Sequence, residues 1–267
     1  MALLELNHVS KTFNPNTINE KKALIDINLK MNEGDFVTVI GGNGAGKSTM
    51  LNAVAGVWPI DAGSIIIDNQ NVTGLPDYKR ASLIGRVFQD PMLGSAPTMQ
   101  IDENLALAAR RGKPRGLKWG VTNSEREEYR ERLKILGLGL ENRLSQKVGL
   151  LSGGQRQALT LLMASIQKPK LLLLDEHTAA LDPQTAKKVL EITKEIVEKD
   201  HLTAMMVTHN MRDAITTGNR LIMMNEGKII FEVDGEEKKN ITVDQLMKKF
   251  AEASGEEFVD DQSLLSK

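Results

Sequence analysis

The sequence contains no cysteine, which excludes disulfide bonds and thiolate metal sites and fits a reducing compartment. It carries almost no net charge, because 34 basic side chains stand against 35 acidic ones. Without an excess of basic side chains, nucleic acid is not an expected partner. No stretch approaches the roughly 18 consecutive apolar residues of a membrane-spanning helix, and the first residues lack the blocks of a signal peptide. Any role at a membrane is therefore expected to depend on a separate polypeptide.

The most informative stretch lies at residues 41–49 and reads Gly-Gly-Asn-Gly-Ala-Gly-Lys-Ser-Thr. The apolar residues 36–40 before it predict a buried parallel strand, and the apolar spacing of residues 50–56 predicts a helix that ends at glycine. Strand, glycine loop and helix form the setting in which this pattern binds phosphate. A glycine-rich turn with a chance Lys-Ser pair is the alternative, and the flanking elements argue against it.

The chemistry of such a loop is direct. Glycines let backbone N–H groups converge on phosphate oxygens, and the helix N-terminus adds partial positive charge. Lys47 would place a charge on the β- and γ-phosphates, and Ser48 would offer a hydroxyl to Mg²⁺. The predicted nucleotide-binding residues of this phosphate loop are Gly41, Gly42, Asn43, Gly44, Ala45, Gly46, Lys47, Ser48 and Thr49.

A pair of carboxylates follows the apolar residues 171–174, which predict another buried strand. Doubly wound sheets bind ligands at the carboxyl ends of their strands. Asp175 would hold Mg²⁺, and Glu176 would orient and deprotonate the attacking water. Because many strands end in Asp-Glu, this pattern gains weight only together with the phosphate loop.

Residues 151–155, Leu-Ser-Gly-Gly-Gln, open another predicted helix. Ser152 resembles a helix N-cap, which is a purely structural interpretation. Gly153 and Gly154 have no capping purpose, and together with Ser152 and Gln155 they would expose backbone amides as a second anion site. Both anion sites could serve one nucleotide if the chain folds back on itself. Alternatively, two chains could lie head to tail and each complete the other's site.

The apolar pattern suggests one domain over residues 3–245. Residues 1–90 mix antiparallel-type strands with the phosphate-loop unit, and residues 91–168 are mainly helical. Residues 169–232 return to the sheet, with a helix predicted over residues 183–199. A short helix is predicted over residues 243–253, and residues 246–267 are expected to form a C-terminal tail. Residues 110–118 carry five basic side chains, which could contact acidic headgroups or a partner subunit. A solvated loop is the plainer interpretation of that charge run.

These motifs together carry a family resemblance. The phosphate loop, Gln89, residues 151–155, the Asp175–Glu176 pair, Ala-Leu-Asp at 180–182 and His209 follow the order found in ATP-binding subunits of ABC transporters. The chain resembles that family from about residue 3 to residue 232. The resemblance implies an α/β fold of the P-loop NTPase class. Its parts would be a RecA-like, mostly parallel sheet core, an antiparallel β subdomain and an ABC-type α-helical subdomain.

The resemblance also implies roles for individual residues. Phe13 would stack on adenine, with a core aromatic side chain as the alternative. Gln89 would contact Mg²⁺ and the attacking water, and Asp182 would link the two sites of a dimer. His209 would contact the γ-phosphate and fix the catalytic Glu176, with a surface histidine as the alternative.

One position departs from the family. His177 stands where the family usually has proline, and its ring could tune the charge near the site. The surrounding residues 176–183 look like those of bacterial ATPases paired with amino-acid importers, with aromatic amino acids among the candidate solutes.

The implied function is an ATPase subunit that uses ATP and Mg²⁺. It would form a head-to-tail homodimer around two ATP molecules and energise import of a small solute through integral membrane permease subunits. A separate substrate-binding protein and a peripheral location on the cytoplasmic face of the cell membrane are expected.

Two other functions compete with this one. A soluble ABC ATPase of the iron–sulfur assembly type is hard to exclude, whereas DNA repair is disfavoured by the missing cysteines and basic face. A different P-loop enzyme, such as a small-molecule kinase, would have no use for residues 151–155.

Overall fold

The N-terminal region folds into an antiparallel sheet of four strands in the order β2-β1-β4-β5. The computed structural model describes residues 2–113 and 120–254. The four strands are β1 (Ala2–Phe13), β2 (Lys21–Asn32), β4 (Ala62–Ile67) and β5 (Gln70–Asn71). In β2, buried Ile27, Leu29 and Met31 alternate with exposed polar residues, as expected of a sheet with one face on the core.

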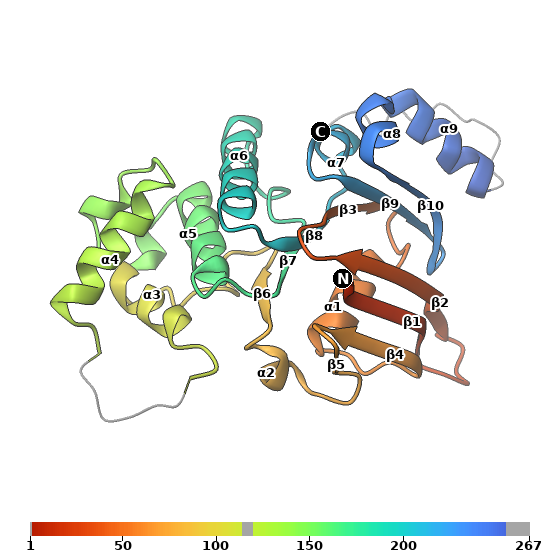
Figure 1. Cartoon of the computed structure of the whole chain (residues 1–267), viewed down its shortest axis with the longest axis horizontal. Helices are drawn as coiled ribbons and strands as arrows, with labels where there is room; N and C mark the ends of the chain where they lie inside the picture. The colour runs from red at the N-terminus through yellow and green to blue at the C-terminus, as the bar shows by residue number, and fades with distance from the viewer. Residues whose placement is uncertain (1, 114–119, 255–267) are drawn as a thin grey trace.

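The second sheet has six strands in the order β10-β9-β3-β8-β7-β6 and occupies the centre of Figure 1. Its strands are β3 (Phe36–Gly41), β6 (Ile84–Val87), β7 (Leu171–Asp175), β8 (Thr203–Val207), β9 (Arg220–Asn225) and β10 (Lys228–Asp234). All neighbours pair in parallel except β10, which pairs antiparallel with β9. The expectation of a mostly parallel sheet beside an antiparallel one is therefore confirmed.

Strand β7 shows how the parallel sheet is buried on both faces. Its residues 171–174 are completely buried, but alternate side chains enter different cores. Leu171 and Leu173 pack in a core shared with the antiparallel sheet and helix α1 (Lys47–Ala55). Leu172 and Leu174 pack in a second core built largely by helices. A continuous apolar run is what a strand covered on both faces requires.

The helical region lies at one end of the molecule, on the left of Figure 1. It contains α3 (Ile101–Ala109), α4 (Asn123–Lys134) and α5 (Gly153–Ser165), with two short 3₁₀ helices at Leu140–Asn142 and Val148–Leu150. Helix α6 (Pro183–Lys199) packs beside α5 and spans the range that its apolar spacing predicts.

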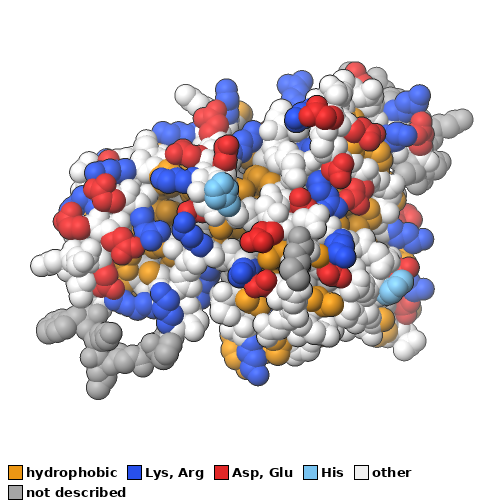
Figure 2. All heavy atoms as spheres, in the orientation of Figure 1, with side chains coloured by type: hydrophobic (Ala, Val, Ile, Leu, Met, Phe, Trp, Pro, Cys, Tyr) orange, Lys and Arg blue, Asp and Glu red, His pale blue; other side chains and the backbone are white. Residues whose placement is uncertain are grey.

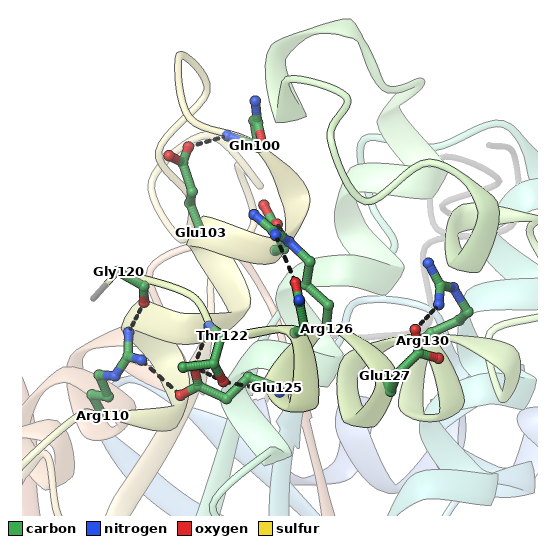
Figure 3. A network of polar contacts seen from close by, with 11 residues as sticks. Gln100, Glu103, Arg110, Gly120, Thr122, Glu125, Arg126, Glu127 and Arg130 are labelled. Carbon is green, nitrogen blue, oxygen red and sulfur yellow. Dashed lines mark hydrogen bonds and ion pairs between the residues drawn. The ribbon is translucent and has the colours of Figure 1, made fainter. Parts of the chain in front are cut away.

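Polar side chains fix where α3 and α4 begin, as Figure 3 shows. Thr122 caps α4 and forms a reciprocal capping box with Glu125, and a similar box joins Gln100 and Glu103 at α3. Arg126 of α4 reaches the fully buried Asp102 of α3, with Nε 2.8 Å from Oδ2. These contacts hold the two helices in one orientation.

The basic segment that the sequence singles out begins at the end of α3. Arg110 pairs with Glu125, and Arg111 donates to the carbonyl of Ala164 at 3.3 Å. Both side chains therefore have partners within the chain. Residues 114–119 of this segment lie outside the described residues.

Three short helices were not predicted: α2 (Asp77–Arg80), α7 (Met211–Thr216) and α8 (Gly235–Asn240). Helix α9 (Val243–Ser254) confirms the helix predicted over residues 243–253, and it crosses the expected domain boundary at residue 245. Its Leu246 is fully buried and Phe250 packs on the same small core, which joins α9 to α7 and the parallel sheet. This part of the expected tail is therefore docked, and residues 255–267 lie outside the described residues.

Side chains of opposite charge are interspersed over the face drawn in Figure 2. Among the described residues, no helix combines the length and apolar character needed to cross a membrane.

Candidate functional site

The phosphate loop adopts backbone conformations that only glycine accepts easily. Gly44 and Gly46 have φ angles of 79° and 102°, in the left-handed region. A Cβ atom on Gly46 would lie 2.4 Å from the carbonyl oxygen of Ala23, and one on Gly41 would lie 2.2 Å from that of Met224. The loop therefore needs these glycines both for its turn and for close backbone packing.

Helix α1 starts directly from this loop. Gly46 is its N-cap and provides no side-chain cap, so the first amides of α1 have no side-chain acceptor at that position. Lys47 is 6% exposed and folds back over the loop, where its Nζ donates to the carbonyl oxygens of Gly41 (2.7 Å) and Gly42 (3.0 Å). Burial lowers the pKa of Lys47, and the carboxylates of Glu176 and Asp175 oppose that shift.

A cavity of about 280 Å³ opens above the loop. Its walls are the loop residues 43–49, Phe13, Lys21, Ala23 and Glu176. Phe13, at the end of β1, is half-buried and meets Trp58 edge-to-face, with ring centroids 5.0 Å apart. The aromatic residue expected beside a nucleotide base thus lies at the phosphate-loop cavity.

The two carboxylates at the end of β7 face different partners. Glu176 borders the cavity and has a φ of 43°, which is uncommon and strained for a residue other than glycine. Its Oε2 lies 3.5 Å from Nδ1 of His209, which follows β8 and has a 58% exposed side chain. Asp175 points toward α1, where its Oδ1 accepts from the Ser48 hydroxyl at 3.3 Å.

Asp175 also meets a cation that the sequence did not single out. Arg86 of β6 places Nη2 3.7 Å from Oδ2 of Asp175, and both side chains are 15% exposed. The same Nη2 donates to Oδ1 of Asn52 at 2.7 Å, and Asn52 in turn donates to the carbonyl of Ser48 at 2.7 Å. Ser48, Asn52, Arg86 and Asp175 thus form a closed ring of polar contacts, which we call the Arg86 ring.

Charge and burial oppose each other at Asp175. Burial raises the pKa of the Asp175 carboxyl, while Arg86, Ser48 and Lys47 act to lower it. Glu176 acts in the same direction as burial because two carboxylates lie side by side. The site therefore concentrates negative charge that cations must balance.

Residues 151–155 lie elsewhere. Ser152 caps α5, and it forms a reciprocal capping box with Gln155, with N–O distances of 3.3 and 3.1 Å. Together with Gly154 these residues border a different cavity of about 600 Å³, which is lined mainly by α6. The chain therefore does not bring residues 152–155 to the phosphate-loop cavity.

Gly154 has a packing role that the sequence interpretation missed. A Cβ atom there would lie 2.1 Å from Cγ2 of Thr185, whereas one on Gly153 would meet Leu181 at an ordinary 3.5 Å. Gly154 is buried between α5 and α6, and Gly153 is exposed. Gly154 therefore allows α5 and α6 to pack closely, whereas the position of Gly153 has room for a larger side chain.

Comparison with known proteins decides the family. A family model described as "ABC transporter" matches residues 24–179. The chain belongs to this ABC transporter family. A tyrosine transport ATP-binding protein of Clostridioides difficile is 43% identical to it over 93% of this chain and 98% of the relative. A spermidine/putrescine import ATP-binding protein, PotA of Haemophilus influenzae, is 37% identical over 85% of this chain. The chain spans only 56% of that relative's length.

Solved ABC cassettes share the fold. One is a dimeric cassette in a post-hydrolysis state bound to ADP and Pi, with 33% identity and a TM-score of 0.74 over 87% of this chain and 98% of the other. Another is the ADP conformation of a transporter cassette, with 28% identity and a TM-score of 0.78 over 96% and 100%. The chain is therefore an ATP-binding and ATP-hydrolysing subunit of an ABC transporter, with the expected α/β fold. These relatives favour neither the kinase alternative nor the iron–sulfur assembly alternative.

Gln89 and Asp182, which the ABC resemblance also singles out, do not line the phosphate-loop cavity. Gln89 follows β6 and is exposed, and the neighbouring Phe88 accepts a hydrogen bond at 3.1 Å from the buried Gln157 of α5. Asp182 caps α6, accepting from the amide of Thr185 at 3.0 Å. Both residues are exposed, and the Asp182 side chain is at the same time engaged as the N-cap of α6.

His177, where the ABC family usually has proline, is only 2% exposed and lies 2.9 Å from the Thr193 hydroxyl of α6. Burial lowers the pKa of His177 to about 4, so the ring is neutral near pH 7. The His177 ring supports α6 and contributes no charge to the phosphate-loop site, contrary to the suggested tuning role.

The residues of the site that the sequence patterns did not predict are Lys21, Asn52 and Arg86. The available signal for Arg86 was a charge inside the otherwise apolar strand β6.

Proposed function

We propose that this chain hydrolyses ATP at the phosphate-loop cavity to drive import of an amino acid, with aromatic amino acids as the favoured class. The supporting observation is the convergence of Lys47, Ser48, Asp175, Glu176 and His209 beyond the carboxyl ends of the parallel strands β3, β7 and β8, next to amides that no side chain caps. The solute class rests on the tyrosine transport relative, which this chain matches over nearly its full length.

In this proposal the loop amides and Lys47 bind the phosphates of ATP. Lys47 would exchange its contacts with the loop carbonyls for phosphate oxygens. Phe13 would stack on adenine, and Lys21 would add a second cation at the cavity wall. Gly41, Gly42, Asn43, Gly44, Ala45, Gly46 and Thr49 would complete the phosphate cradle.

The donor set of the Arg86 ring fits Mg²⁺. Ser48 and Asp175 present a hydroxyl and a carboxylate oxygen 3.3 Å apart, and Mg²⁺ prefers oxygen ligands shared between protein and phosphates. We assign Ser48, Asp175 and Gln89 as the residues that would hold it, and bound Mg²⁺ would neutralise charge on the β- and γ-phosphates.

Glu176 is the proposed general base. It borders the cavity, and its strained backbone is held by a hydrogen bond from its amide to the carbonyl of Val207 at 3.0 Å. His209 would hold the Glu176 carboxylate in position and contact the γ-phosphate. Together they would orient a water molecule and take its proton.

The proposed working unit is a head-to-tail homodimer. Ser152, Gly154 and Gln155 line a cavity separate from the phosphate loop, and Gly153 lies between them in sequence, so a second chain is the proposed means of bringing these residues and the loop to one nucleotide. Asp182, exposed at the start of α6, would link the two sites. A solved relative that is dimeric with ADP and Pi supports this arrangement.

Coupling to transport requires other polypeptides. We propose integral membrane permease subunits that hold this chain peripherally at the cytoplasmic face of the cell membrane, together with a separate substrate-binding protein. Loss of the gene should abolish uptake of labelled tyrosine while leaving spermidine uptake intact. The opposite pattern would overturn the proposed solute class.

The experiment that tests the active site measures turnover and binding separately. We expect Glu176→Gln to retain ATP affinity and lose most hydrolysis, at least about a hundredfold, as for removal of a general base. Lys47→Ala should weaken ATP binding in a titration. Near-normal hydrolysis by Glu176→Gln would show that Glu176 is not the base, and unchanged affinity in Lys47→Ala would contradict the phosphate-loop assignment.

A further inference from the structure

Arg86 is a fixed cation beside the carboxylate that the proposed function assigns to Mg²⁺. Three contacts hold it: Asp175 at 3.7 Å, Asn52 at 2.7 Å, and the ring of Phe88, whose centroid lies 4.5 Å from the guanidinium carbon. Its side chain is 15% exposed, so little water screens its charge. Arginine remains charged under these conditions.

The two oxygens of Asp175 are divided between two partners. Oδ2 faces Arg86, whereas Oδ1 faces the Ser48 hydroxyl at 3.3 Å. Arg86 reaches the same region by a second route, because Asn52 joins its guanidinium to the backbone of Ser48. Arg86 therefore both orients the Asp175 carboxylate toward Ser48 and neutralises part of its charge.

The two cations near the carboxylates differ in freedom. Lys47 is bound to loop carbonyls by a flexible side chain and can move to a phosphate group. Arg86 lies on β6, the edge strand of the parallel sheet, which pairs with β7 in register from Ile84 to Val87, and its guanidinium is held by Asp175, Asn52 and the Phe88 ring. Its positive charge consequently stays beside Asp175 whether or not another cation binds.

We propose that Arg86 is a positioning residue that competes electrostatically with Mg²⁺ for Asp175, and so sets the free Mg²⁺ concentration that nucleotide binding requires. This inference rests on the proposed function. It goes further by assigning a residue that weakens metal affinity while it stabilises the metal-free site. Without Arg86, the paired charges of Asp175 and Glu176 would repel metal-free ATP more strongly and attract Mg²⁺ more strongly.

The size of the effect follows from Coulomb's law. A doubly charged ion about 8 Å from Arg86 is repelled as strongly as a singly charged ion about 4 Å away, because twice the charge acts over twice the distance. In water this repulsion lowers the affinity for the ion about fivefold, and it lowers the affinity by more in a partly buried site. Binding of nucleotide and metal must respond reciprocally, because linkage holds for equilibrium affinities. The ratio of nucleotide affinities with and without Mg²⁺ should therefore increase when the charge is removed.

The test titrates a fluorescent, non-hydrolysable ATP analogue (mant-AMP-PNP) against the full chain over a range of free Mg²⁺. Electron paramagnetic resonance of Mn²⁺ reports bound metal directly. Arg86→Gln removes the charge but keeps a hydrogen-bonding group for Asn52. We expect it to need at least about fivefold less Mg²⁺ at half-saturation, and to bind the analogue more weakly in EDTA. Arg86→Lys should stay close to the wild-type Mg²⁺ requirement.

Arg111→Gln is the matched control. Arg111 is also an arginine with a buried, unpartnered Nε, but it contacts Ala164 in the helical region. Its loss should leave the Mg²⁺ requirement unchanged. If Arg86→Gln does not fold, Arg86→Met decides by the same criterion, because it keeps a long side chain of similar packing while it removes the positive charge.

The outcomes separate the two proposals. An unchanged or larger Mg²⁺ requirement in Arg86→Gln, with wild-type binding that depends on Mg²⁺, overturns the role of Arg86 and leaves the proposed function intact. Wild-type protein that binds no analogue, or binds it without response to Mg²⁺, overturns the proposed function itself.

Discussion

His177 is a histidine that the fold keeps neutral. It is buried against Thr193 of α6, and burial lowers its pKa from 6.5 to about 4. In an unfolded chain the same ring takes up a proton near pH 6.5, so acid favours the unfolded state. The neutral ring's contribution to stability is complete above about pH 6.5 and is lost as the pH falls toward 4.

This linkage predicts an acid-sensitive stability that one substitution removes. We expect wild-type protein to lose up to about 3 kcal/mol through this group between pH 7 and pH 4, and His177→Asn to lose correspondingly less. Thermal unfolding at several pH values measures the difference. His201→Asn, at an exposed position, is the control. Equal pH dependence in wild type and His177→Asn would contradict the burial argument.

At the scale of elements, the contact between α5 and α6 depends on one glycine. Gly154→Ala places a methyl group where Cγ2 of Thr185 now lies, whereas Gly153→Ala meets Leu181 at an ordinary distance. We expect Gly154→Ala to unfold at lower temperature, by about 1–3 kcal/mol of overpacking. Gly153→Ala should be neutral or slightly stabilising, because alanine favours helix. Equal stability of the two variants would show that Thr185 simply rotates away.

The elements that the sequence predicts well share strong local signals. Helix α6 has Asp182 as a cap, proline at its first position and apolar residues at helical spacing, and both of its ends match the prediction. Residues 171–174 form a strand because four consecutive leucines fit a strand buried on both faces. The short helices α7 and α8 were missed because six residues contain too few apolar positions to reveal a period.

The residues of the candidate site likewise fall into those that local sequence patterns predict and those that only the tertiary fold brings together. Lys47, Ser48 and Glu176 follow from local patterns, because strand, loop and helix are contiguous in sequence. Arg86 and Asn52 could not be predicted as partners of Asp175, since the contact joins three elements that only tertiary folding brings together. The roles of Gln89 and Asp182 stay predictions, because the proposed partners of Gln89 are Mg²⁺ and a water molecule and that of Asp182 is a second chain.

At the scale of the whole molecule, the proposed dimer makes a sharp prediction. Glu176→Gln saturated with Mg-ATP should double in mass by light scattering, because binding persists while turnover stops. Adding Ser152→Asp keeps a good helix cap but sets a negative charge against the partner's phosphates. This double variant should bind ATP and remain a single copy. Single copies of Glu176→Gln under saturating Mg-ATP would contradict the head-to-tail arrangement.

The placement of Ser152 and the phosphate loop at separate cavities has a genetic consequence. Under the proposed pairing, every working site draws half its parts from each of two gene products. A cell that makes sound and damaged copies in equal amounts would assemble half of its dimers as mixed pairs, and damage to one half of the faulty chain would disable one of the two sites in each mixed pair. Damage on opposite halves of two alleles would, in contrast, leave one reconstituted site in each mixed pair, so such alleles should partly rescue each other.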